Sequence, residues 1–219
     1  MNTRLSNARL TTCRPIRFAA GAALMVGSLA AHAIPVTWSG TTGNWFDPSQ
    51  WNPTQVPTSG DIASVNNGGT ANAAAGIAAN RLFIGTLSGA TPSATGSVVV
   101  SSGDVVTDIP VVGQTTTAGV GAVATGSLTI SNGNLLPSGF FPFGVTVGQN
   151  VASDGIANGT INIPNGSILL GNVASNPDLF IGMASGGATK SGSATGAVTA
   201  QAIDTSVNAL RSVLIGRAD

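Results

Sequence analysis

Two carboxylates, Asp104 and Asp108, are the side chains of this sequence best spaced for acid–base chemistry. They are four residues apart, so an extended backbone between them would place both on one face of a strand. An enzyme that cleaves glycans could use such a pair as general acid and general base. Each residue also neighbours a turn signal in the sequence. We therefore expect both to be solvated loop carboxylates, and we assign no catalytic residue.

The N-terminal segment has the pattern of a secretory signal. Four arginines precede or enter a small-residue apolar stretch at residues 18–30, and Ala31-His32-Ala33 fits the small-x-small cleavage pattern. The stretch is too short to span a bilayer comfortably. We expect residues 1–33 to be a cleavable signal peptide that leaves Ile34 as the new N-terminus. The protein is then exported, and it is located at the cell surface, in association with the outer membrane, or outside the cell.

Cleavage at this point would remove most of the reactive side chains. Cys13 and His32 would be lost, and the remaining 186 residues (219 minus 33) carry four basic residues, eight Asp and no Glu, a formal charge of 4 minus 8, or −4. Without His, Cys or Glu, no Ser-His-Asp triad, Cys-His dyad or imidazole or thiolate metal site can form, and a Ser-Lys pair would need Lys190. The charge gives no reason to expect a nucleic-acid partner. We expect no enzymatic activity, no cofactor and no metal.

Three tryptophans, Trp38, Trp45 and Trp51, are grouped near the start of the expected mature chain, and the sequence contains no tyrosine. Grouped aromatic rings in an exported protein can form a platform on which sugars stack, so these three residues are our candidate binding site. The same rings could instead cover the end of a repeat fold, where the first repeat would expose apolar core and unpaired backbone. We favour the cap over the binding site.

A degenerate repeat organises the rest of the chain. A short apolar pattern that ends in glycine recurs with its glycines 28, 35, 34 and 34 residues apart. A second pattern, Ala-Thr-Gly-Ser followed by alternating apolar and polar residues, recurs at residues 94–100 and 124–130, with variants at 158–163 and at 194–200, where Ala197 replaces the serine. We interpret it as a small-residue turn followed by a strand with one buried face. The glycines of the first pattern are Gly85, Gly113, Gly148, Gly182 and Gly216.

Turn signals follow three of these strands, at Ser102-Gly103, Asn132-Gly133 and Asn165-Gly166. The weak helix candidates at 71–79 and 205–213 lack an apolar stripe, so we expect no helix. A repeat of this length cannot bury its apolar face alone, but stacked repeats can.

The predicted fold is therefore all-β, a right-handed parallel β-solenoid (β-helix) with an N-terminal Trp-rich cap. A β-sandwich is the alternative, because regular short strands also build sandwiches. The expected organisation is a signal peptide at 1–33, a cap with the first strands at 34–80, and solenoid repeats at 81–219.

The segment around the tryptophans resembles the start of many bacterial surface proteins. Residues 38–51 read W-x-G-x-x-G-N-W-x-D-P-x-x-W, and residues 124–135 read A-T-G-S-L-T-I-x-N-G-N-L. Together they are similar to autotransporter-type passengers and related exported β-helix proteins, over most of the expected mature chain. The resemblance implies secretion to the cell surface and a role in adhesion or surface structure. Such passengers continue into a translocating β-barrel, so we expect this chain to be truncated at its C-terminus, with membrane contact only through a separate translocator.

These observations predict a non-enzymatic cell-surface or secreted scaffold, an adhesin-like passenger segment whose partners are host or surface glycans or matrix. Loops at 115–123 and 139–144 would be presented to those partners, and the second loop carries Phe140, Phe141 and Phe143. Two alternatives remain, a carbohydrate-binding module that uses the tryptophans and a glycan-active enzyme that uses the paired aspartates.

Overall fold

The computed structural model describes residues 33–88, 92–116, 121–138, 143–151, 154–170, 178–184, 192–204 and 212–216. All of them belong to one compact unit, Ala31–Asp219. Residues 1–32, which hold nearly all of the expected signal peptide, lie outside the described residues, so the prediction of cleavage remains a prediction.

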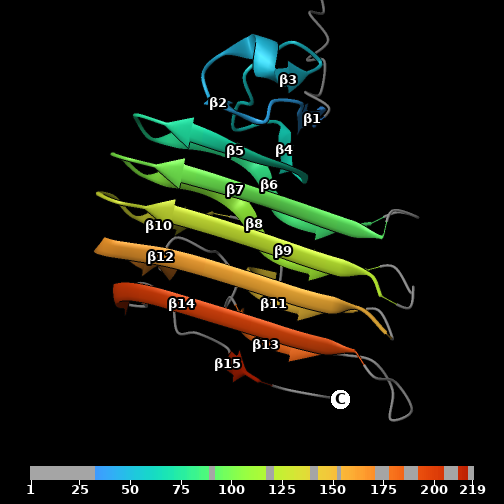
Figure 1. Cartoon of the computed structure of the whole chain (residues 1–219). Helices are drawn as coiled ribbons and strands as arrows, with labels where there is room; N and C mark the ends of the chain where they lie inside the picture. Colours follow the sequence, from blue (N-terminus) through green and yellow to red (C-terminus); the bar gives the residue numbers. More distant parts are fainter. Residues whose placement is uncertain are drawn as a thin grey trace, which may run out of the picture. The chain divides into compact units, whose positions relative to one another are not determined.

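The described residues form a β-solenoid. Short strands pair in parallel with their equivalents one coil away, and the stack contains about five coils (Figure 1). This confirms the prediction of an all-β solenoid over a sandwich. A 3-10 turn is assigned at Pro48–Gln50, and within the described ranges no helix is long and apolar enough to cross a membrane.

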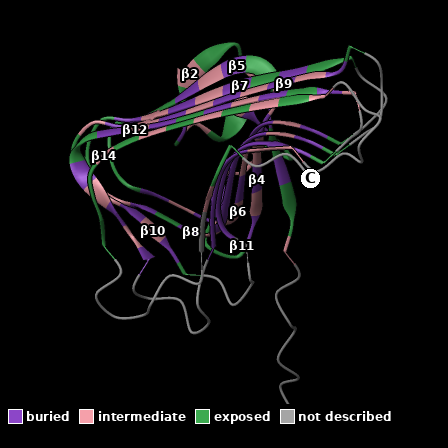
Figure 2. Ribbon diagram, turned by 90° about the horizontal axis from the view of Figure 1, so that it is seen from below, coloured by how far each residue is buried: buried purple, intermediate pink, exposed green. Residues whose placement is uncertain are grey.

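Each coil has three faces, which an end view separates clearly (Figure 2). The long face contains β2 (Thr42–Asn44), β5 (Asn67–Ala73), β7 (Ser93–Val100), β9 (Val123–Ile130), β12 (Ile156–Leu169) and β14 (Ser193–Asp204). The curved face contains β4 (Ile62–Val65), the later parts of β6 (Ile77–Leu87) and β8 (Val105–Thr115), β11 (Phe143–Asn150), β13 (Asp178–Ala184) and β15 (Ser212–Ile215). The short face contains the first residues of β6 and β8, then β10 (Leu135–Pro137) and the ends of β12 and β14.

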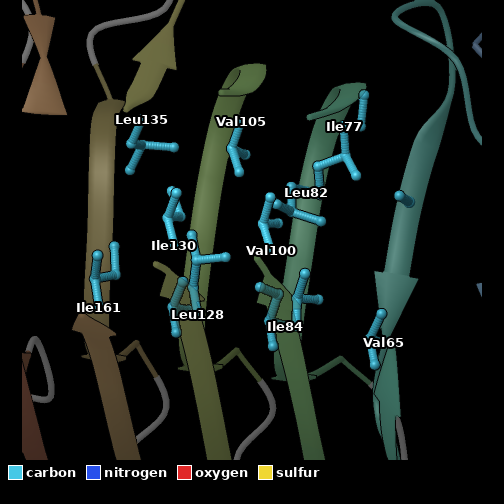
Figure 3. Packing of buried hydrophobic residues seen from close by; sticks show 14 of the residues in the cluster. Val65, Ile77, Leu82, Ile84, Val100, Val105, Leu128, Ile130, Leu135 and Ile161 are labelled. Atoms are coloured by element: carbon cyan, nitrogen blue, oxygen red, sulfur yellow. The ribbon is translucent and has the colours of Figure 1, made fainter. Parts of the chain in front are cut away.

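The parallel register stacks similar side chains into columns inside the solenoid. On the long face, Val98 pairs with Leu128 and Leu128 with Ile161. On the short face, Val105 pairs with Leu135, and Leu135 with Ile168. All of these side chains are fully buried in one core cluster, and Figure 3 shows several of them in successive coils. Full burial of one such side chain contributes about 1.5–3 kcal/mol, so the columns supply the main stabilisation.

The two ends of the stack differ. At the N-terminal end, β1 (Pro35–Trp38) pairs in parallel with β4 and antiparallel with β3 (Trp51–Asn52), above the first coil (Figure 1). At the other end, the last described positions of two columns are open, with Ile203 41% and Ile215 71% exposed. Burial of the columns therefore depends on having a coil on each side.

Two rows of glycine bring the long face and the curved face into backbone contact. Gly85, Gly113 and Gly148 of the curved face have φ of 59°, 68° and 64°, which L residues rarely adopt. A Cβ on Gly85 would come within 3.0 Å of the backbone of Thr125 and Gly126. A Cβ on Gly126 would meet the backbone of Ile84 and Gly113 just as closely. The long-face glycine thus fits between two successive coils of the curved face.

This contact corrects the interpretation of the Ala-Thr-Gly-Ser pattern. Its glycines lie inside β7, β9, β12 and β14 rather than in turns before them. Each long-face strand is already paired with the strand of the next coil at this position, as Gly96 of β7 is with Gly126 of β9. Gly103 has the positive φ expected of a turn, at 85°. Gly166 instead lies inside β12, where a register shift between Ile163 and Ser167 replaces the turn.

The unequal repeat lengths also have a structural origin. Between Gly85 and Gly113, the chain crosses from the short face to the curved face inside one continuous strand, β8. In the next coil, β10 ends at Pro137 and β11 begins at Phe143, so an insertion lies between the two faces. β10 and β11 both pair with β8, so the register of the core columns is the same before and after the insertion.

Substitution of Gly126 by Ala should be far more damaging than substitution of Gly68 or Gly60, which lack its backbone contact. Gly126 has no positive φ, so its cost would come from the backbone contact alone, and we expect about 4 kcal/mol or more. Gly68 has a φ of 85° and open space around it, so Gly68→Ala should cost about 1–2 kcal/mol. Gly60 has neither feature and is the control. Urea unfolding followed by far-UV circular dichroism measures all three. Equal midpoints for Gly126→Ala and Gly60→Ala would contradict the contact.

Candidate functional site

The two aspartates predicted as an acid–base alternative both bind neighbouring coils. Asp104 Oδ1 accepts hydrogen bonds from the backbone N–H of Asn134 at 2.8 Å and from its Nδ2 at 3.1 Å. Asp108 accepts from Asn80 Nδ2 through one oxygen and from Ser138 Oγ through the other, each at 2.6 Å. The two carboxylates therefore link three successive coils.

The expectation of two solvated loop carboxylates is wrong in part. Asp104 directly precedes β8, but Asp108 lies within β8, and both are only partly exposed. The reason is that β8 continues through the corner between the short and curved faces, where the sequence Ile109-Pro110 suggests a turn.

The three tryptophans form one buried cluster, which we call the Trp cluster (Trp38, Trp45 and Trp51). Their exposed fractions are 1%, 0% and 2%. Trp51 makes edge-to-face contacts with both neighbours, with ring centroids 4.9 Å from Trp38 and 4.7 Å from Trp45. Its Nε1 donates a hydrogen bond to the carbonyl oxygen of Trp45 at 2.8 Å. The cluster is continuous with the apolar core and adds to its N-terminal end.

The loop between Trp45 and Trp51 is held by Asp47. The carboxylate of Asp47 accepts hydrogen bonds from the hydroxyl of Ser49 at 2.7 Å and from its backbone N–H at 2.9 Å. The hydroxyl contact, followed by the backbone contact, lowers the pKa of Asp47 below its usual value. Asp47 thereby caps the 3-10 turn that carries the chain to Trp51.

Some residues named in the sequence analysis lie outside the described residues. They include Lys190, considered for a Ser-Lys pair, and Phe140 and Phe141 of the predicted partner-binding loop. Phe143 starts β11, and Thr115 ends β8 as a buried residue rather than a loop position. Within the described ranges, no group of three or more His, Cys, Asp or Glu is close enough to hold a metal ion.

Sequence reasoning missed a groove on the outer surface of the curved face. A cavity of about 430 Å³ is lined there by a row of Phe83, Val111 and Thr146 and by a second row that contains Gln114 and Gln149. Strand pairing places Phe83, Val111 and Thr146 at equivalent positions in successive coils. We call this surface, defined by those five residues, the curved-face groove.

The strands that form the curved-face groove are buried on both sides. Ile109, Val111 and Val112 are all buried, although neighbouring residues in a strand point to opposite faces. The strands of the curved face bend in the end view (Figure 2), and the outward-facing residues Phe83, Val111 and Thr146 line the cavity. Consecutive apolar pairs such as Val111-Val112 and Phe180-Ile181 are the sequence signal of such a doubly buried strand.

The polar residues of the groove bond to one another from coil to coil. Gln114 Nε2 donates to Gln149 Oε1 at 2.5 Å, and the next position in each strand repeats the pattern, with Thr115 Oγ1 donating to Asn150 Oδ1 at 3.3 Å. A second cavity, of about 320 Å³, shares Phe83 and Gln114 with the first and extends toward β4.

Comparison with protein-family models, with curated proteins and with solved structures gave no match for this chain. Its function is therefore inferred from the geometry of the described residues.

Two tryptophans offer a matched test of the Trp cluster. Trp51→Phe removes a buried hydrogen bond, whereas Trp38 Nε1 has no partner among the described residues, so Trp38→Phe removes the same atoms without that loss. We expect Trp51→Phe to be less stable than Trp38→Phe by about 1–3 kcal/mol.

The fluorescence of the remaining tryptophans during urea unfolding reports on the cluster directly, since the sequence has no tryptophan outside it. Equal unfolding midpoints for the two variants would show that the Trp51–Trp45 hydrogen bond does not stabilise the cap.

Proposed function

We propose that this chain is a non-enzymatic scaffold that acts outside the cell, at the cell surface or secreted, as an adhesin-like passenger segment. The main observation behind the proposal is that Asp104 and Asp108 both accept hydrogen bonds from neighbouring coils. Their carboxylates bind donors on adjacent coils, which is what a stacking role requires and what a free acid–base pair would not do.

The remaining polar side chains support the same function. Asn66 and Thr86 exchange two hydrogen bonds across one coil boundary, at 3.0 Å and 2.8 Å. Asn134 Oδ1 accepts from the backbone N–H of Ser167 in the next coil at 3.0 Å. These contacts hold the coils in register in a chain whose single cysteine, Cys13, cannot form an intrachain disulfide.

Burial of the Trp cluster favours a cap over a sugar platform. A stacking platform needs an exposed ring face, and these rings expose 2% or less. In this proposal the tryptophans protect the first coil, and recognition uses other surfaces of the solenoid, such as the curved-face groove.

Export gives a first test of the proposal. When the full chain is produced in a Gram-negative host, the protein recovered outside the cytoplasm should begin at Ile34, because signal peptidase selects the small residues at Ala31 and Ala33. N-terminal sequencing of the fractionated protein measures this. An intact N-terminus on protein that stays in the cytoplasm would contradict the proposal.

Turnover gives the second test. The full chain is incubated with neutral and acidic polysaccharides, and released reducing ends are measured for the wild type and for the Asp104→Asn, Asp108→Asn double variant. We expect background release from both, while the double variant loses about 1–3 kcal/mol of stability because inter-coil hydrogen bonds are weakened. Release by the wild type that disappears in the double variant would identify a glycan-active enzyme instead.

A further inference from the structure

The curved-face groove has the chemistry of a ligand site rather than of a bare scaffold surface. Its volume, about 430 Å³, lies in the range of small-ligand sites, which combine apolar walls with a few placed polar groups. Phe83 and Val111 supply the apolar floor, and Gln114 and Gln149 supply amides beside it. Gln149 is 7% exposed and is held by its bond to Gln114, so the amide row is ordered before any ligand arrives.

The groove crosses the coils along the stack. Ser64, Phe83, Val111 and Thr146 occupy equivalent positions on four successive strands, and Met183 lines the first cavity from the next strand, β13. With about 4.8 Å between neighbouring strands, four intervals cover about 19 Å. Each coil adds one outward position after a distance close to the length of one sugar unit in an extended glycan. A linear polymer fits this repetition better than a single compact ligand.

Charge and hydrogen bonding indicate which polymer fits. No carboxylate is among the described residues that line the two cavities, and Arg81, the charged residue there, already has an interaction of its own. The backbone groups of the floor are paired with neighbouring coils. An extended peptide would therefore find no free strand edge to pair with, and its own N–H and C=O groups would lose water without replacement. A sugar chain avoids this cost because its C–H faces are apolar while its hydroxyls remain at the rim.

We propose that the curved-face groove binds an uncharged oligosaccharide that lies across the coils, with sugar C–H faces on Phe83 and Val111 and hydroxyls bonded to Gln114 and Gln149. This inference rests on the proposed function in one respect, that the solenoid is a scaffold whose outer surfaces recognise a partner. It assigns recognition to a surface distinct from the Trp cluster.

Calorimetric titration of the full chain with cellohexaose, xylohexaose and mannohexaose tests the inference. We expect at least one hexasaccharide to bind and Phe83→Leu, which keeps apolar bulk but removes the ring, to weaken that binding about tenfold. Gln114→Ala should weaken it as well. Thr129→Ala is the matched control, since Thr129 lies on the outer side of β9 on the long face, and it should bind like the wild type.

Far-UV circular dichroism and the unfolding midpoint are recorded for every variant, and Phe83→Leu decides the result if Gln114→Ala does not fold. The inference is overturned if no hexasaccharide binds, or if binding is unchanged in Phe83→Leu. It is also overturned if an uncharged ten-residue peptide binds at Phe83 and the sugars do not. Chromatography of the titrated sugars separates the two proposals, because shorter products would contradict the non-enzymatic scaffold while leaving the groove in place.

Discussion

The contact between the two glycine rows is the constraint on which the other features of this solenoid depend. Gly126 lies against the backbone of Ile84 and Gly113, so the long face and the curved face approach each other more closely there than any side chain allows. Since each long-face glycine fits between two curved-face coils, the contact also sets the stagger of the two faces. The apolar columns are then left to fill the wider part of the coil, where Leu128, Ile130 and Leu135 are fully buried.

The polar side chains take the place that charged pairs and disulfides have in many exported proteins. Asp104, Asp108 and Asn134 each bind a neighbouring coil through hydrogen bonds of 2.6–3.1 Å. Such bonds contribute about 1 kcal/mol each, but an unmade one would leave a desolvated group, so they favour one register over all others. The same side chains that the sequence offers for catalysis are thereby taken up in holding the stack together.

In the proposed function, protection of the first coil and recognition use separate surfaces. The Trp cluster covers the first coil with rings that expose 2% or less, which leaves no ring face for a ligand. The curved-face groove, by contrast, combines the partly exposed ring of Phe83 with the ordered amides of Gln114 and Gln149. The groove results from the repeat itself, because each coil adds one more copy of the same outward positions. A site of this kind can lengthen with the number of coils and suits a polymeric ligand.

The sequence alone determined the repeat and the strand periodicity, because these depend on local alternation and on a fixed spacing; it favoured the solenoid over a β-sandwich, and the parallel pairing of strands between coils decided for the solenoid. The sequence also identified Trp38, Trp45 and Trp51 as the cover of the first coil, from their clustering. Tertiary structure alone decided what the glycines do: the sequence pattern places Gly96 and Gly126 in turns, but they lie in strands, since a backbone contact between coils leaves no mark in the local pattern. For the same reason the sequence placed Asp108 in a loop and did not reveal the curved-face groove, whose residues come from separate coils and meet only when the coils stack.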